Sequence, residues 1–267
     1  MSNLLLLKLG GSLLTDKAGV EALRPAVLGR LAQEVQAARR EDPDLQLVVG
    51  HGSGSFGHVA AARHGTARGA HTPEEWRGFA DVSAAAARLN RLVTEALLAA
   101  GVPALSLQPS ASALCEDGTL IQLAVEPVRM ALQRNLVPVV YGDVAFDRHR
   151  GGTIISTEKI LSFLVKHLRP SWLLLAGETE GVYDAEGQVA AAITPETFPA
   201  LEAALGASRG TDVTGGMDSK VRGMLELVRT HPALRVSVFS GLEPGRLQQA
   251  LLQPGQVTGT IIRCQDL

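Results

Sequence analysis

Short apolar runs recur along the chain, separated by longer stretches in which apolar residues have helical spacing. An apolar run bounded by turn residues is typical of a strand that is covered on both faces, as in a parallel sheet. The predicted strands are Leu4–Leu9, Leu45–Gly50, Val137–Tyr141, Trp172–Ala176 and Arg235–Phe239. The predicted helices are Arg24–Arg40, Pro73–Ala100, Glu158–Leu168 and Met217–Thr230. This alternation predicts an α/β fold, an open αβα sandwich around a mainly parallel sheet.

The helix beginning at Pro73 has the clearest start signal. Thr72 can cap it, proline occupies its first position, and two acidic residues follow. Along it, Trp76 and Phe79 begin an apolar stripe that continues at helical spacing. Such a stripe either packs in the core or lines a pocket for an apolar ligand.

Length leaves one or two domains open, since 267 residues exceed the ~150 of an average domain. Two polar, glycine-rich segments, 148–153 and 207–216, are candidate linkers. Both are short, and both adjoin candidate ligand motifs. We therefore predict one domain over residues 1–267.

Composition and charge exclude several classes of function. Twenty-five basic and 27 acidic residues give a net charge of -2, which provides no basic surface for nucleic acid or an anionic membrane. Cys115 and Cys264 are too few for a disulfide framework, and their spacing fits no zinc motif. We find neither a signal-peptide pattern nor an apolar run of ~18 residues. A cytoplasmic protein is expected.

Three glycine-rich segments adjoin predicted strands or helices. In the first, Gly10, Gly11 and Ser12 follow Lys8, and Lys17 comes soon after. Backbone N–H groups beside glycines can approach an anion, and a lysine adds a point charge. An ordinary turn with a solvated lysine is the alternative.

The third segment places Gly215 and Gly216 before a predicted helix, with Lys220 one turn inside it. The positive end of that helix and the lysine together suit a phosphate. A glycine turn with a surface lysine is again the alternative. A Walker A sequence is absent from the chain, which excludes a P-loop kinase.

The second segment, His51–His58, contains Gly52, Gly54 and Gly57 in G-x-G-x-x-G spacing directly after a predicted strand. A dinucleotide site would also need a carboxylate at the end of a second strand. The acids at the expected distance, Glu74 and Glu75, open a helix instead. A nicotinamide oxidoreductase is therefore only weakly supported.

Five motifs together resemble the amino acid kinase superfamily, and within it the isopentenyl phosphate kinases. They are KLGGS at Lys8, HGSGSFGH at His51, VYGDVAFD at Val140, GETEGVYD at Gly177 and DVTGGMDSKV at Asp212. VTGTIIR at Val257–Arg263 also resembles the last strand of the superfamily. The histidine that ends GSFGH, His58, favours a kinase with a phosphate acceptor. Fosfomycin kinases are similar in this respect, so a small phosphate or phosphonate kinase is the alternative.

The resemblance implies ATP and Mg²⁺, a homodimer, and transfer of the γ-phosphoryl group to isopentenyl phosphate in isoprenoid biosynthesis by the mevalonate route. It implies an acceptor site in the N-terminal part and an ATP site in the C-terminal part. Lys8 and Lys220 would hold ATP phosphates, and Lys17 would contact the transferred group.

Further contacts are implied position by position. The implied phosphate cradle consists of Gly10, Gly11, Ser12 and Gly54, with Gly216 before Lys220. The implied acceptor-phosphate contacts are Ser53, Gly57, His58 and Gly152. Gly181 through Tyr183 would border the nucleotide, and Trp76 and Phe79 would line the isoprenoid tail if they are not simply core.

Two departures from the family pattern are present. Ser156-Thr157-Glu158 replaces a common Ser-Gly-Asp, so a nucleotide role for Glu158 is left open. Glu178-Thr179-Glu180-Gly181 replaces Asp-Val-Asp-Gly. Asp143 and Asp147 could orient lysines or water, or bind metal, and no residue is assigned as a metal ligand. A non-catalytic nucleotide-binding protein would have less need for all three lysines.

The chemistry explains the choice of residues. Phosphoryl transfer requires alignment and charge neutralisation rather than covalent catalysis. A phosphate acceptor with a second pKa near ~6 is already ionised at neutral pH and needs no general base. We therefore expect His58 to donate a hydrogen bond to the acceptor phosphate rather than to act as a base.

Overall fold

A sheet of eight strands forms the centre of the computed structural model, which describes residues 4–16, 18–66, 69–207 and 216–265. Its strands are β1 Leu4–Leu9, β2 Gln46–His51, β3 Ala104–Ser106, β6 Val137–Tyr141, β9 Trp172–Gly177, β10 Ala192–Ile193, β11 Arg235–Ser240 and β12 Thr260–Ile262. Their order is β10-β12-β11-β9-β1-β2-β6-β3. Every neighbouring pair is parallel except β11 and β12. The predicted mainly parallel sheet is thus confirmed.

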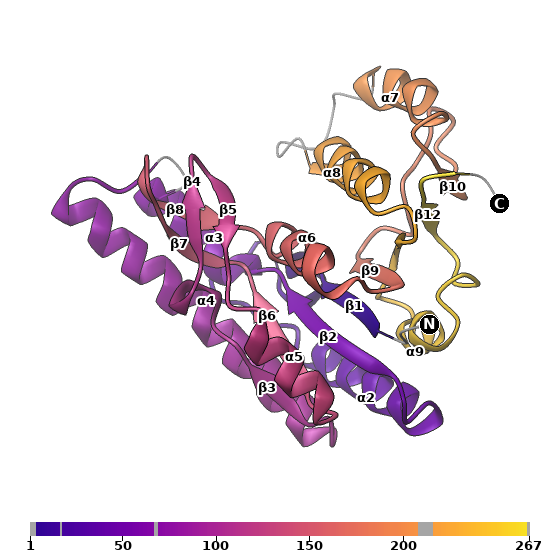
Figure 1. The fold of residues 1–267 in the computed structure, drawn as a ribbon, viewed down its shortest axis with the longest axis horizontal. Helices are drawn as coiled ribbons and strands as arrows, with labels where there is room; N and C mark the ends of the chain where they lie inside the picture. Colours follow the sequence, from indigo (N-terminus) through magenta and orange to yellow (C-terminus); the bar gives the residue numbers. More distant parts are fainter. Residues whose placement is uncertain (1–3, 17, 67–68, 208–215, 266–267) are drawn as a thin grey trace.

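Helices cover both faces of this sheet (Figure 1). Those on one face are α1 Gly11–Leu14, α2 Pro25–Glu41, α3 Gly54–His64, α4 Pro73–Ala99 and α9 Arg246–Leu252. Those on the other side are α5 Glu126–Gln133, α6 Thr157–Leu168, α7 Phe198–Ala207 and α8 Gly216–Thr230. The four predicted helices coincide with α2, α4, α6 and α8 to within a residue at each end. The predicted start of α4 is also confirmed, because Thr72 and Glu75 form a capping box.

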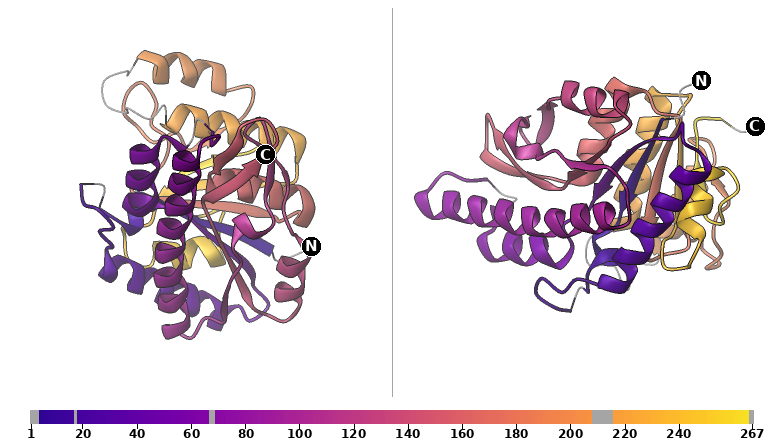
Figure 2. Two further views of the ribbon diagram at one scale, coloured as in Figure 1. Left: turned by 90° about the vertical axis from the view of Figure 1, so that its left-hand side faces the viewer. Right: turned by 90° about the horizontal axis from the view of Figure 1, so that it is seen from below.

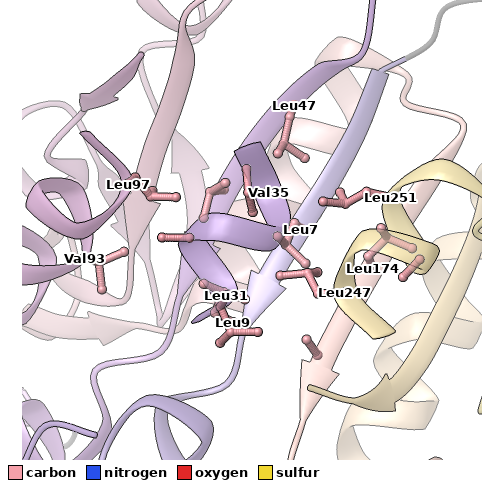
Figure 3. Close-up of a cluster of buried hydrophobic side chains, with 14 of the residues drawn as sticks. Leu7, Leu9, Leu31, Val35, Leu47, Val93, Leu97, Leu174, Leu247 and Leu251 are labelled. Atoms are coloured by element: carbon pink, nitrogen blue, oxygen red, sulfur yellow. The ribbon is translucent and has the colours of Figure 1, made fainter. Parts of the chain in front are cut away.

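Strand β1 shows why the sheet is buried on both faces. Leu5, Leu7 and Leu9 pack into the core on the α2, α4 and α9 side, whereas Leu4 and Leu6 pack on the α6 and α8 side. Figure 3 shows the first of these cores, with Leu7 surrounded by leucines and valines of neighbouring strands and helices. Each such leucine contributes about 2 kcal/mol by burial. The apolar run of β1 therefore fixes the strand at the centre of the sheet.

A second, smaller sheet was not predicted from the sequence. Its strands are β4 Leu114–Glu116, β5 Thr119–Gln122, β7 Asp143–Asp147 and β8 Gly151–Ile155, in the order β5-β4-β7-β8. The candidate linker at 148–153 is the turn and first part of the β7–β8 hairpin, so the linker interpretation of this segment is wrong. Most of the other candidate linker, 207–216, lies outside the described residues. Helix α4 extends past the large sheet and contacts β7 and β8 (Figures 1 and 2).

The resemblance also predicted a final strand within Val257–Arg263, and the structure has the shorter β12 there. Within the described part of the chain, no helix is long and apolar enough to cross a membrane.

Candidate active site

Loops that leave the parallel strands meet at one edge of the large sheet. β1, β2, β6, β9 and β11 run in one direction, so their carboxyl ends share this edge. Backbone hydrogen bonds join the loops, each between an N–H just after one strand and a carbonyl of its neighbour: Gly10 to Ala176, Gly52 to Leu9, Gly142 to His51 and Gly241 to Gly177, at 2.8–3.3 Å. The predicted glycine-rich segments after β1 and β2 therefore lie side by side.

These two glycine segments interlock. A Cβ atom on Gly11 would lie 2.5 Å from the Gly54 nitrogen, so neither backbone can approach the other with a larger residue there. Gly54 has φ +50, and a Cβ on it would lie 2.2 Å from Thr15 Oγ1. Thr15 Oγ1 in turn accepts a hydrogen bond from Ser55 N–H at 2.9 Å. Sequence reasoning missed this threonine, which has no motif signal of its own.

The interlocked segments hold four backbone donors at the starts of α1 and α3. Among the described residues, no acceptor is paired with the N–H groups of Gly11, Ser12, Ser53 and Gly54. Unpaired N–H groups at helix starts favour an anion, and the two helices bring them together from separate segments. This geometry fits the predicted phosphate cradle.

Ser53 and Gly57 are packed against each other on the first turn of α3. A Cβ on Gly57 would lie 2.5 Å from both Cβ and Oγ of Ser53, so only glycine leaves room for that serine. His58 is the next residue and is exposed. It follows Gly54 by four positions, which places it one helical turn along the same side of α3. The predicted acceptor-phosphate residues of this segment thus share one helix start.

Lys8, near the end of β1, forms an ion pair with Glu158, the second residue of α6. Its Nζ lies 2.9 Å from Glu158 Oε1, with both side chains largely buried. Burial alone would raise the pKa of Glu158, but the charge and hydrogen bond of Lys8, together with the charge of Lys220, lower it below its ordinary value. Glu158 is therefore ionised, paired with Lys8 and influenced by the charge of Lys220. The structure brings together three predicted residues, one of which had been left open.

Gly216 is the first residue of α8, and Lys220 is the fifth and is exposed. Lys17 lies outside the described residues. On the nucleotide side, Gly181 is buried beside Val189 and Thr260. Tyr183 begins a β-bridge to Val189 and is 39% exposed. The predicted nucleotide border thus follows β9, next to β1.

An aromatic cluster lies between α4 and the β7–β8 hairpin. Trp76, Phe79 and Phe146 have ring centroids 5.3–5.9 Å apart. Phe79 is buried, Trp76 is half-buried, and Phe146 is 56% exposed. A Cβ on Gly152 would lie 2.8 Å from the Phe79 ring, so that glycine lets β8 approach the cluster.

Ala60 and Ala61 of α3 pack against the same apolar group, which connects it to the helix that carries His58. The predicted residues Trp76, Phe79 and Gly152 are therefore together. Phe146 was missed, although it lies within the VYGDVAFD motif, between Asp143 and Asp147.

In the part of the chain that the structure describes, the carboxylates of Asp143 and Asp147 accept hydrogen bonds from backbone N–H groups and from a serine hydroxyl, with no lysine among these donors. Asp143 accepts hydrogen bonds from the Ser83 hydroxyl, at 2.9 Å, and from the N–H groups of Val144 and Ser110. Asp147 accepts from four N–H groups of the adjacent turns, those of Asp117, Gly118, His149 and Arg150. Asp143 thus joins β7 to α4 and to Ser110, whereas Asp147 holds the turns of the small sheet. Within the described ranges, no group of three or more His, Cys, Asp or Glu side chains could hold a metal ion.

The dinucleotide interpretation of Gly52–Gly57 lacks its ribose carboxylate in the structure. Glu74 and Glu75 open α4, and Glu75 accepts hydrogen bonds from the N–H groups of His71 and Thr72. These acids belong to a helix start and not to a strand end, where such a site needs them.

Comparison with known proteins agrees with the geometry. The family model of the Amino acid kinase family matches residues 3–240. Isopentenyl phosphate kinase of Methanocaldococcus jannaschii is 30% identical over 265 residues, covering 97% of this chain and 98% of that protein. Isopentenyl phosphate kinase of Haloferax volcanii is 40% identical over 228 residues, covering 84% and 88%. A crystal structure of an isopentenyl phosphate kinase superposes with a TM-score of 0.80 at 29% identity, covering 97% of this chain and all of that one. The chain therefore belongs to the amino acid kinase family and is a phosphotransferase.

Proposed function

We propose that the protein transfers the γ-phosphoryl group of ATP to isopentenyl phosphate, giving isopentenyl diphosphate and ADP. The observation that carries this proposal is the position of His58, one turn after the N–H cradle at the start of α3 and on the helix that packs against the aromatic cluster. Hydrogen-bond donors for a phosphate, next to an apolar cluster, suit an acceptor with a phosphate head and a short hydrocarbon tail. Relatives that bear the name isopentenyl phosphate kinase support the same acceptor.

The proposed step is a direct in-line displacement. An oxygen of the acceptor phosphate forms a bond to the γ-phosphorus while the bond from that phosphorus to the bridging oxygen of ADP breaks. No proton has to be removed first, because the acceptor is already an anion. The obstacle is repulsion between two anions, which positive charge at the site reduces.

Lys8 and Lys220 are the described residues proposed to supply that charge. The Glu158 carboxylate lies 2.9 Å from the Lys8 ammonium, and the charges of both lysines lower its pKa. Glu158 would therefore stay ionised near neutral pH and orient the lysines. Lys17, outside the described residues, is proposed from the family motif to contact the phosphoryl group in transfer. The unpaired N–H groups of Gly11, Ser12, Ser53 and Gly54 would bind phosphate oxygens.

His58 is proposed to donate a hydrogen bond to the acceptor phosphate, with Ser53 and Gly57 shaping the start of the helix that presents it. Its exposure leaves the ring open to a ligand. A hydrogen bond from a protonated imidazole to phosphate is charge-assisted and stronger than a neutral one.

The tail is proposed to lie against Trp76, Phe79 and Phe146. Burial of a five-carbon chain against these rings would add affinity in proportion to the apolar area covered. The close approach of Gly152 to Phe79 closes one side of this cluster and so limits the space for a longer tail.

ATP is proposed to bind along Gly10, Gly181, Tyr183 and Gly216. Since the described carboxylates form no group of three that could hold an ion, Mg²⁺ is proposed to arrive as the counter-ion of ATP. The chain is proposed to work as one unit, with the acceptor in its N-terminal part and the nucleotide in its C-terminal part.

A homodimer is proposed through the β3 edge of the large sheet. Three large apolar side chains are exposed around this edge: Leu98 of α4, Leu105 of β3 and Met130 of α5. Light scattering on the wild type and on Leu105→Lys tests this proposal. A dimer that dissociates in the variant supports it, and a monomeric wild type contradicts it.

The experiment for the activity is an ADP-release assay with Mg²⁺-ATP and isopentenyl phosphate, dimethylallyl phosphate, fosfomycin or no acceptor. Turnover that depends on isopentenyl phosphate supports the proposal. Turnover with fosfomycin alone would contradict isopentenyl phosphate as the acceptor and would indicate a phosphonate kinase of the same fold.

A further inference from the structure

His51, the last residue of β2, is fully buried, and its ring contacts Gly52, Asn90 of α4 and Tyr141 of β6. Its Nδ1 lies 3.0 Å from the Gly52 carbonyl oxygen, and its Nε2 lies 3.2 Å from Asn90 Oδ1 on α4. The Asn90 amide also contacts Ser106 Oγ of β3. Tyr141 of β6 stacks on the ring, with centroids 5.6 Å apart and an angle of 9° between the planes.

Both ring nitrogens of His51 thus face oxygen atoms, and this arrangement has two chemical solutions. Either the ring is an imidazolium that donates twice, or it is neutral and the Asn90 amide is rotated by 180°, which exchanges its oxygen and nitrogen. In the second case Ser106 donates to Asn90, Asn90 donates to Nε2, and Nδ1–H donates to Gly52. Each of these three contacts then joins a donor to an acceptor.

The surroundings of the ring favour the neutral solution. Burial lowers the pKa of His51 below its ordinary value and outweighs the hydrogen bonds with Gly52 and Asn90, which raise it. The ionisable group packed against the ring is Tyr141, and burial and the nearby Asp143 raise the pKa of that phenol, so it stays neutral. Lys8 and Glu158 are not on this side, because Lys8 pairs in register with Gly50 and its neighbour Leu9 pairs with His51.

We propose that His51, as a neutral imidazole with its proton on Nδ1, is a positioning residue for the acceptor-phosphate segment. The Gly52 carbonyl and the Ser53 N–H belong to one trans peptide unit and point in opposite directions. A hydrogen bond that holds the carbonyl therefore fixes the direction of the N–H. That N–H is one of the four unpaired donors at the two helix starts. The functional part of this inference rests on the proposed phosphate acceptor.

The main chain of His51 extends the same role to the nucleotide side. Its carbonyl accepts hydrogen bonds from the Thr157 hydroxyl at 2.6 Å and from Gly142 N–H at 3.3 Å. Thr157 precedes Glu158, the partner of Lys8. One residue therefore joins the acceptor segment, α4 beneath it, and the start of α6.

The protonation state is tested on the wild-type protein by ¹⁵N NMR of its histidine rings. We expect one buried ring to keep the neutral Nδ1–H pattern, without titrating, between about pH 6 and 8. His51→Asn removes that signal and so assigns it. An imidazolium pattern, or a neutral Nε2–H pattern, for this ring would overturn the proposal.

The positioning role is tested by two matched variants. An asparagine amide nitrogen can replace Nδ1, whereas a glutamine amide nitrogen replaces Nε2 and leaves the Gly52 carbonyl without its donor. Loss of that one hydrogen bond should raise the KM for isopentenyl phosphate about tenfold in His51→Gln, with a smaller change in His51→Asn and in the KM for ATP. Two results would contradict positioning. One is the same KM for isopentenyl phosphate in His51→Gln and His51→Asn, and the other is an equal rise in the KM for isopentenyl phosphate and for ATP that follows the loss of thermal stability. A wild type without turnover would refute the proposed function instead. The NMR result would still determine the protonation state and tautomer of the His51 ring.

Discussion

The Lys8 ammonium and the Glu158 carboxylate, 2.9 Å apart, join the end of the first strand to the start of α6. Sequence reasoning placed Lys8 at the phosphates but left Glu158 open, because this chain has glutamate where the family often has aspartate. The pair shows that the longer side chain still reaches the lysine.

Replacing Glu158 by glutamine should lower kcat/KM by roughly tenfold to a hundredfold, because Lys8 loses the charge that orients it. Glu158→Asp keeps the charge and should lose less. Glu95→Gln is the matched control, since it removes an exposed ion pair with Arg91 on α4 and should change nothing measurable. Equal activity of Glu158→Gln and Glu95→Gln in steady-state assays would contradict the orienting role.

Gly54→Ala should destabilise the protein by about 2 kcal/mol or more and remove activity, because the new Cβ would overlap Thr15 Oγ1. Gly65→Ala provides the comparison. Gly65 also has positive φ, at +63, but it has open space around it, so only the backbone strain of about 1 kcal/mol should appear. Thermal unfolding and turnover of the two variants separate crowding from strain. Similar losses of stability and turnover in Gly54→Ala and Gly65→Ala would show that crowding against Thr15 is not the cause.

Asp147 should stabilise the fold in a pH-dependent manner. Burial would raise its pKa, but four backbone N–H donors lower it from 3.8 to about 2. A carboxylate with a lowered pKa stabilises the folded state above its unfolded pKa, and this stabilisation is lost as the pH falls through the folded value.

Asp147→Asn should therefore unfold more readily than the wild type at pH 7, by about 2 kcal/mol. The difference should shrink between about pH 4 and pH 2. Melting curves across this range measure it. A difference that does not change with pH would show that the carboxylate charge is not responsible.

Phe146→Ala should raise the KM for isopentenyl phosphate about fivefold to tenfold through loss of apolar contact with the tail, while the KM for ATP stays unchanged. Leu242→Ala removes a similarly exposed apolar side chain outside the aromatic cluster and is the control. If both KM values rise together in Phe146→Ala, the aromatic cluster is structural and does not contact the tail.

The parts of the fold with strong local signals were predictable from the sequence. The buried runs at Leu4–Leu9 and Trp172–Ala176 and the capped helix at Pro73 match the structure because their patterns are local. The small sheet was not predictable in this way, since β4 and β5 have three and four residues and depend on pairing with each other and with β7.

The same distinction applies to the site. Glycine motifs located the segments proposed to bind phosphate. The pairing of Gly11 with Gly54 and of Lys8 with Glu158, however, depends on strands β1 and β2 lying next to each other and on α6 beginning beside them. Thr15 and Phe146 were missed for the same reason. Thr15 belongs to no motif, and Phe146 lies in the VYGDVAFD segment but gains its place in the aromatic cluster only from Trp76 and Phe79, far along the chain.

The central claim, transfer to a phosphate monoester held by His58, is tested most directly by ³¹P NMR of Mg²⁺-ATP and isopentenyl phosphate incubated with the wild type and with His58→Ala. We predict that the monoester signal of the wild-type reaction is replaced by the two coupled signals of a diphosphate as ADP forms. The variant should react far more slowly while still binding ATP. A monoester signal that persists in the wild-type reaction, or a His58→Ala variant as fast as the wild type, would contradict this account.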